Sequence, residues 1–81
     1  RVATVDGRTI ELSQREFVLL NRLMQRAGQV CLREDLLAEV WGYTFNTSSN
    51  VLDVYIRRLR TKLDPNCIQS VRNAGYSFIA N

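Results

Sequence analysis

One stretch constrains the fold of this chain more than any other, and it covers residues 50–63. At about 100° per residue, the rotation of an α-helix, its apolar side chains fall on one narrow stripe. The stripe consists of Leu52, Ile56, Leu59 and Leu63. The opposite side presents Asn50, Val54, Arg57, Arg58 and Thr61, and the flanks carry Val51, Asp53, Tyr55, Arg60 and Lys62. The spacing therefore predicts a helix that packs on a core by one face and exposes cations on the other.

Positive charge is concentrated in the same part of the chain. Residues 1–49 hold six Lys or Arg and six Asp or Glu, whereas residues 50–81 hold five Lys or Arg and two Asp or Glu. The second segment therefore accounts for the whole net charge of +3. Asp53 can pair with Arg57 one helical turn later, which leaves three cations of the helix without a local partner. A basic helix face is usually only a solvated surface, but uncompensated charge of this kind favours an anionic polymer as partner.

The residue types argue against several classes of function. The 81 residues make one domain and include no histidine, so a histidine-based catalytic triad and the commonest metal ligand are absent. The sequence also has no Gly-rich phosphate loop and no paired-cysteine motif. Cys31 and Cys67 lie far apart, and we expect both to be reduced thiols that contribute to packing. The sequence therefore predicts a chain that is not an enzyme and that holds no cofactor and no metal.

The sequence also bears on location. It has no signal peptide and no apolar run long enough to cross a membrane, so we expect a cytoplasmic protein without a membrane partner. The chain begins at Arg1 rather than at Met, which suggests that it is a piece of a longer protein.

The first thirty residues read as a β-hairpin followed by a helix. Residues 2–5 and 8–12 are strand-like, and Asp6-Gly7 between them suits a type I′ turn. Ser13 and Glu16 form a capping box that begins the helix, and Gly28 is expected to end it as its C-cap. The core face of this helix is expected to hold Phe17, Leu20, Leu23, Met24 and Ala27.

A second helix is expected from about Arg33 to Trp41, with no capping side chain before it and with Gly42 ending it. Its inward residues are Leu36, Leu37 and Val40. Residues 42–48 should form a loop. The N-cap of the basic helix is then Ser48, Ser49 or Asn50.

After Asp64-Pro65-Asn66 ends the basic helix, the chain reads as a second hairpin. Its strands are expected at residues 69–72 and 76–80, and its turn is Asn73-Ala74-Gly75, where Gly75 can take a positive φ. Alternation along the strands turns Val71 inward. The outward pair is Ser70 and Arg72, and the core-facing pair is Tyr76 and Phe78.

This order of elements predicts an α+β fold, a winged helix-turn-helix. It has three helices, an N-terminal β-hairpin and a C-terminal β-hairpin wing. The major groove of B-DNA admits one α-helix, so the basic helix would lie there with side chains at base edges and cations at phosphates. The wing would place Arg72 in the adjacent minor groove.

The residues also resemble a known family, the DNA-binding effector domain of OmpR/PhoB-type two-component response regulators. Four blocks carry the resemblance: residues 12–20 (LSQREFVLL), 33–42 (REDLLAEVWG), 54–63 (VYIRRLRTKL) and 71–78 (VRNAGYSF). Together they extend over nearly the whole chain. Family members usually have four strands before the first helix, whereas this sequence has room for about two, so truncation at the N-terminus is expected.

The resemblance implies roles for individual residues. It makes Arg58 the main base-reading residue, helped by Val54, Tyr55, Val51 and Asn50. Relatives often have Arg, Thr and His at positions 50, 51 and 55, so the preferred DNA sequence should differ. The expected phosphate contacts are Arg57, Arg60, Lys62, Trp41, Ser70 and Tyr76. Both Trp41 and Tyr55 could instead belong to the core. Arg72 is the minor-groove residue of the wing.

The resemblance also implies partners and a regulatory context. Tyr43, Thr44, Phe45 and Asn46 lie where activators of the family face RNA polymerase, and the alternative is that this loop is only a turn-like connection. The whole protein would control transcription as a response regulator, with a sensor kinase acting through an absent receiver domain. The isolated domain would be a monomer that pairs on double-stranded DNA. The alternative is a winged helix that acts as a protein-protein interaction module without DNA binding.

Overall fold

A computed structural model describes residues 1–5, 7–42 and 48–79 of the chain. Its helices are α1 (Gln14–Gln25), α2 (Arg33–Trp41) and α3 (Val51–Lys62). Its strands are β1 (Val2–Val5), β2 (Arg8–Glu11), β3 (Cys31–Leu32), β4 (Ile68–Val71) and β5 (Gly75–Phe78). The three expected helices and both expected hairpins are therefore present, each within a few residues of its predicted bounds.

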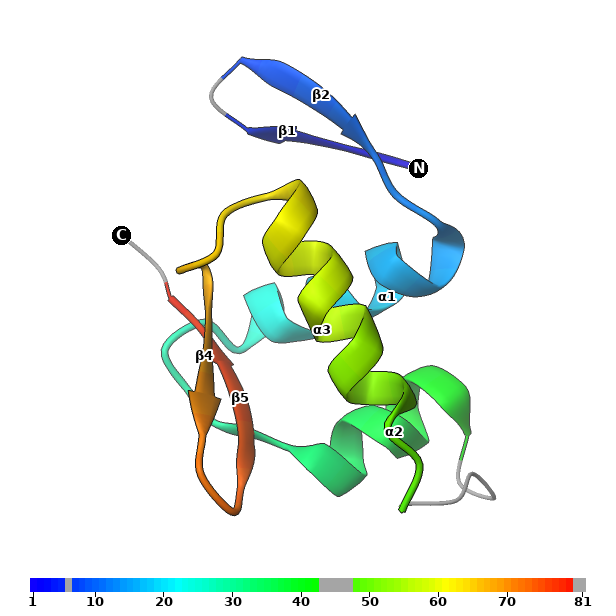
Figure 1. Cartoon of the computed structure of the whole chain (residues 1–81), viewed down its shortest axis with the longest axis vertical. Helices are drawn as coiled ribbons and strands as arrows, with labels where there is room; N and C mark the ends of the chain where they lie inside the picture. Colours follow the sequence, from blue (N-terminus) through cyan, green and yellow to red (C-terminus); the bar gives the residue numbers. More distant parts are fainter. Residues whose placement is uncertain (6, 43–47, 80–81) are drawn as a thin grey trace.

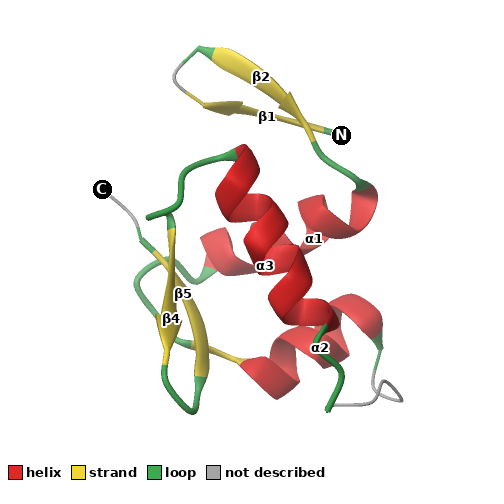
Figure 2. Cartoon of the chain, in the orientation of Figure 1, coloured by secondary structure: helices red, strands yellow, loops and turns green. Residues whose placement is uncertain are grey.

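The helix α3 runs through the middle of the molecule, with the other elements arranged around it (Figure 1). The hairpin β1–β2 lies beyond the C-terminal end of α3, and the β4–β5 hairpin, which we call the wing, lies along one side of it. The helices α1 and α2 pack against α3 and against each other. In Figure 2 the turn of the wing lies toward the same end of the molecule as the N-terminus of α3.

The core is aliphatic and draws on all three helices. Its fully buried apolar residues are Leu12, Leu19, Leu20, Leu23, Cys31, Leu36, Leu37, Leu52, Ile56, Leu59 and Ile68. Three of the four stripe residues of α3 are among them, and the fourth, Leu63, is half-buried against the same cluster. The helical periodicity read from residues 50–63 is therefore confirmed, and it fixes which side of α3 faces solvent.

The helix α1 begins as expected but ends differently. Ser13 Oγ accepts a hydrogen bond from the Glu16 amide, and Glu16 Oε1 accepts one from the Ser13 amide, which completes the capping box. The helix stops at Gln25, so the predicted C-cap role of Gly28 was wrong; the C-cap is Arg26. Gly28 has a φ of +84° and lies beyond the helix, where its amide donates to the Phe78 carbonyl.

One predicted core residue of α1 is on the surface. Met24 is 50% exposed, whereas Leu19, which the prediction omitted, is fully buried. The buried face is centred on Leu19 and Leu23 because α1 is covered by α2, α3 and β5 together. A stripe counted on one isolated helix does not indicate how wide the covered face is.

A short strand that the sequence analysis did not predict completes a second sheet. This strand, β3, pairs antiparallel with β5, and the sheet order is β3-β5-β4. Gly75 lies where the two strands meet, opposite Leu32, and a Cβ atom placed on it would be 2.0 Å from the Cys31 carbonyl oxygen. The positive φ expected at Gly75 is found instead at Asn73, at +62°. Gly75 is therefore needed for close approach of a neighbouring strand, and Asn73 for the turn.

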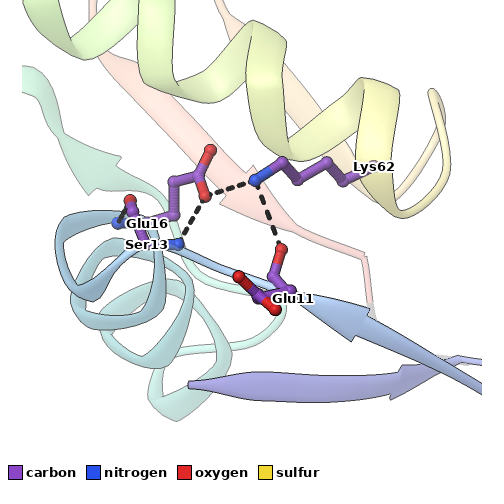
Figure 3. Close-up of polar contacts among 4 residues, drawn as sticks. All are labelled: Glu11, Ser13, Glu16 and Lys62. Carbon is purple, nitrogen blue, oxygen red and sulfur yellow. Dashed lines mark hydrogen bonds and ion pairs between the residues drawn. The ribbon is translucent and has the colours of Figure 1, made fainter.

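An ion pair between a buried carboxylate and a partly exposed lysine joins α1 to the C-terminal end of α3 (Figure 3). Lys62 Nζ lies 2.7 Å from Glu16 Oε1 and 3.3 Å from the Glu11 carbonyl oxygen. The Glu16 side chain is only 2% exposed. Burial by itself raises the pKa of Glu16, but the hydrogen bonds from Lys62 and from the Ser13 backbone outweigh it and hold that pKa below its ordinary value. Glu16 is therefore a carboxylate at neutral pH.

Replacing Lys62 by methionine should destabilise the domain. The Glu16 carboxylate would lose its cation while staying buried, so we expect the free energy of unfolding at pH 7 to fall by about 1–3 kcal/mol. Because the pKa of Glu16 is depressed in the folded state, the pair contributes above the ordinary carboxyl pKa and is lost as the pH falls through the folded value. The difference between wild type and Lys62→Met should therefore shrink in acid.

Urea unfolding from pH 7 to pH 3, followed by circular dichroism, measures this difference. Arg57→Met is the matched control, because it removes an exposed cation from the same helix and should change the free energy by no more than about 0.5 kcal/mol. Equal effects of the two variants at pH 7 would show that Lys62 contributes no more than a surface charge.

Candidate nucleic-acid interface

The solvent-facing side of α3 carries two exposed arginines, Arg57 and Arg58. The buried stripe turns them away from the core, as the periodicity predicted. The Arg58 guanidinium lies over the Tyr55 ring, 4.7 Å from the ring centre. No hydrogen bond or ion pair of Arg57 with another described residue is found, so the expected pair with Asp53 was wrong. Both guanidinium groups can therefore donate hydrogen bonds to an external ligand such as an anion.

Aromatic rings connect this face of α3 to the other two helices. Trp41, the last residue of α2, packs edge-on against Tyr55, with ring centres 5.2 Å apart and an angle of 80° between the planes. The Arg15 guanidinium of α1 lies 5.5 Å from the centre of the Trp41 ring. Both rings are half-buried and pack against the core cluster. Trp41 and Tyr55 are therefore part of the packing, and they also hold Arg58 and Arg15 in place at the surface.

The N-terminal end of α3 is polar and only partly covered. Asn50 is the N-cap and is exposed, but its side chain makes no capping bond; Ser49 Oγ accepts from the Val51 amide instead. Val51 and Val54 are half-buried. A side chain at position 50 is thus free to contact a ligand, while Val51 is shared between the surface and the core.

Two cations expected at the surface are engaged within the fold. Arg60 donates from Nε and Nη2 to the Ile68 carbonyl oxygen, at 3.0 and 2.7 Å, and from Nη2 to Ser70 Oγ at 2.9 Å. Lys62 pairs with buried Glu16. Neither cation has a partner within α3, as expected, but the fold supplies partners from β4 and α1 that the sequence analysis did not foresee. Their roles as phosphate contacts stay predictions.

Asp53 joins α3 to the wing and to α2. Its Oδ1 accepts a hydrogen bond from the Tyr76 hydroxyl at 2.5 Å, and its Oδ2 lies 3.6 Å from Arg33 Nη2. Arg33 also donates to the Ser49 carbonyl oxygen, just before α3. Burial raises the pKa of Tyr76 to about 12, with a further contribution from the hydrogen bond to Asp53, so the phenol keeps its proton.

In the wing, Ser70 and Arg72 are exposed and Val71 is half-buried. Ser70, however, pairs with Tyr76 across the wing and accepts a hydrogen bond from Arg60, so it lies on the face turned toward α3 and its predicted outward orientation was wrong. Tyr76 and Phe78 share a half-buried face against the core, as predicted. Arg72 follows the last residue of β4 and has no hydrogen bond or ion pair with any residue in the described ranges. Beside the turn, Asn73 and Tyr76 line a hollow with Arg33 and Glu34 of α2.

The sequence analysis did not identify Arg15 and Arg33 as residues of this surface. It also did not predict that Asp53 would contact the wing. Arg33 begins α2 and Arg15 lies in the first turn of α1, so each is far along the chain from the residues it contacts. Only the four-block family pattern, which contains all three positions or their neighbours, could have drawn attention to them.

Some expectations concern residues outside the described ranges. The predicted RNA polymerase contacts Tyr43, Thr44, Phe45 and Asn46 all lie in the segment 43–47, which is not described. Among the described residues, no group of His, Cys, Asp or Glu could hold a metal ion. The described helices are all too short or too polar to cross a membrane.

Comparisons with known proteins agree with this arrangement. The family described as "Transcriptional regulatory protein, C terminal" matches residues 7–78. The response regulator ArlR of Staphylococcus saprophyticus is 44% identical over 77 residues, covering 90% of this chain and 35% of that protein. The transcriptional regulatory protein PcoR of Escherichia coli is 42% identical over 80 residues, covering 94% and 35%. The chain thus spans about a third of the length of these curated relatives.

Two solved structures have the same fold. The RstA DNA-binding domain of Klebsiella pneumoniae, determined in complex with the RstA box, is 37% identical with a TM-score of 0.87. That comparison covers 98% of this chain and 83% of the other. The DNA-binding domain of CpxR from E. coli is 36% identical with a TM-score of 0.86, covering 98% and 82%. The chain therefore belongs to the family of transcriptional regulatory protein C-terminal domains, and its α+β fold is the winged helix of response-regulator DNA-binding domains.

Proposed function

We propose that this domain binds double-stranded DNA sequence-specifically, with α3 in the major groove and the wing at the adjacent minor groove. The observation that carries the proposal is the pair Arg57 and Arg58, exposed on the side of α3 opposite its buried stripe and without ion-pair partners in the described structure. The likeness to a domain solved with its DNA box supports binding to double-stranded DNA. An exposed helix of this width fits the major groove.

The exposed residues divide by what they can reach. Arg58, stacked on Tyr55, holds its planar guanidinium ready for a guanine edge, and Asn50 and Val54 lie on the same helix for neighbouring bases. Arg57 has no such support and suits a phosphate. Trp41 is half-buried and Ser70 is already bonded to Arg60, so we assign both secondary phosphate contacts at most. The Tyr76 hydroxyl donates its proton to Asp53, so we assign it no direct phosphate contact.

The whole protein is proposed to be a cytoplasmic response regulator of transcription. Its receiver domain would take a phosphoryl group from a sensor kinase, and paired domains would then occupy adjacent half-sites on DNA. Residues 43–46 are proposed to face RNA polymerase if the protein is an activator. The length of the curated relatives, about three times that of this chain, supports the presence of further parts.

Binding to duplex DNA should weaken steeply with salt. Because Lys62 is paired with Glu16 and Arg60 is directed toward β4, we expect roughly three to four neutralised phosphates and a slope of log affinity against log salt of about −3 to −4. Fluorescence anisotropy on a duplex selected from random sequence, from 50 to 300 mM salt, measures the slope. If the domain is instead an interaction module without DNA binding, the duplex anisotropy should not rise with added protein, and any weak signal should not depend on salt.

Replacing Arg58 by alanine should reduce sequence discrimination. Loss of a bidentate contact to guanine should cost about 1–3 kcal/mol on the selected duplex and little on a scrambled one. Arg57→Ala is the matched control, since it removes the same charge from the neighbouring position and should weaken both duplexes alike. Equal losses on the two duplexes for Arg58→Ala would contradict the assignment.

Replacing Arg72 by alanine should remove any preference for A·T pairs beside the core site. The narrow minor groove of A·T-rich DNA attracts a guanidinium, and Arg72 leaves the wing on its solvent side. Arg72→Lys should restore only part of the preference, because an ammonium is more strongly hydrated. Affinities for A·T-flanked and G·C-flanked duplexes decide this. If wild type and Arg72→Ala discriminate them equally, the wing contacts phosphates only.

A further inference from the structure

The recognition helix α3 has a third side, which faces the wing. Asp53 and Arg60 are seven residues apart, and seven steps of about 100° return to within about 20° of the starting direction, so they lie two turns apart on one side. From that side Asp53 accepts a hydrogen bond from the hydroxyl of Tyr76 on β5. Arg60 donates hydrogen bonds to the Ile68 carbonyl oxygen and to Ser70 Oγ on β4. One acidic and one basic side chain thus hold both strands of the wing.

These contacts occupy most of the donors that a phosphate would use. The Tyr76 hydroxyl has one proton, which it donates to Asp53 at 2.5 Å, and it has none left for a phosphate oxygen. Arg60 directs Nε and Nη2 toward β4, and its guanidinium lies over the Tyr76 ring at 5.8 Å. The Tyr76 hydroxyl and the Nε and Nη2 groups of Arg60 are therefore engaged between α3 and the wing, and Nη1 is the part of Arg60 left for a phosphate.

The wing needs such a connection. Strand β5 pairs with β3 and packs on α1, and Ile68 anchors the start of β4 in the core, whereas no described backbone element besides β5 makes extensive contact with β4. Arg58 and Arg72 belong to different elements, so the distance between them depends on the angle of the wing to α3. Side-chain bonds from α3 to both strands fix that angle before any partner arrives.

We infer that Asp53 and Arg60 are positioning residues that hold the wing at a fixed orientation to α3, so that Arg58 and Arg72 meet DNA as one rigid unit. Tyr76 acts through Asp53 and not as a phosphate donor. The inference rests on the proposed DNA binding. The contact with the wing also explains why the recognition helix carries the carboxylate of Asp53. Without such a contact, a negative charge there would only repel the DNA phosphates.

A double-mutant cycle tests this connection. Tyr76→Phe removes only the hydroxyl and should weaken binding to the selected duplex by about fivefold in the wild-type background. In the Asp53→Ala background the same change should have no further effect, because the partner of the hydroxyl is already gone. If Tyr76→Phe costs the same in both backgrounds, the hydroxyl contacts DNA by itself and the inference is overturned.

Charge and position are separated by a matched pair of variants. Asp35 is the third residue of α2, as Asp53 is of α3, and it is exposed. Asp35→Ala removes the same negative charge and should leave binding unchanged or slightly tighter, whereas Asp53→Ala should weaken it. Asp53→Asn keeps an acceptor oxygen and should recover part of the loss. Tightening by Asp53→Ala to the level of Asp35→Ala would mean that Asp53 acts only as a charge, and would overturn the inference.

A measurement without DNA keeps the test independent of the proposed function. Nitrogen-15 relaxation of the free domain should show larger picosecond-to-nanosecond motion at residues 72–74 in Tyr76→Phe and in Asp53→Ala, with thermal unfolding showing that both variants stay folded. Unchanged order in the wing of both variants would overturn the inference even if DNA binding holds. A wild-type domain that binds no duplex would instead refute the proposed function.

Discussion

The arrangement of this domain depends on burying one side of α3 between α1 and α2. Leu52, Ile56 and Leu59 are fully buried, and their removal from water is the dominant favourable term in holding α3 in place. Since these side chains fix the rotation of the helix, they also decide which cations point outward. Arg57 and Arg58 are exposed because of residues that would never touch DNA.

Polar contacts then fix the position of α3 along its axis and its position relative to the wing. An apolar stripe sets rotation about the helix axis but resists sliding along that axis less well. The pair Lys62–Glu16 holds the C-terminal end of α3 to the start of α1, and Asp53 and Arg60 connect its length to the wing. The Glu16 carboxylate serves twice, since it also completes the cap of α1. The start of α1 and the end of α3 are thus coupled through one buried charge.

Much of this fold could be read from the sequence, because periodicity and turn chemistry are local. The three helices, both hairpins and the capping box follow from spacings of two to four residues. The strand β3 could not be read, because two residues carry no period and its pairing partner lies more than forty positions away. Gly75 was misread for the same reason: its constraint is the Cys31 carbonyl oxygen, which only the folded chain brings near.

The candidate site shows the same division between near and distant neighbours. Exposure of Arg57 and Arg58 followed from helical rotation, and exposure of Arg72 from its place at the turn of the wing; Ser70 is also exposed but faces α3, which alternation did not predict. The partners of Arg60 and Lys62 could not be predicted from the sequence. A long, flexible cationic side chain on a helix flank can turn toward solvent or toward the protein, depending on what the fold places beside it. Counting the cations of one helix therefore overestimates how many of them are free to turn toward a polyanion. In this domain the available charge is concentrated on two adjacent helical positions and on the wing, where the remaining contacts keep those positions in a fixed spatial relation.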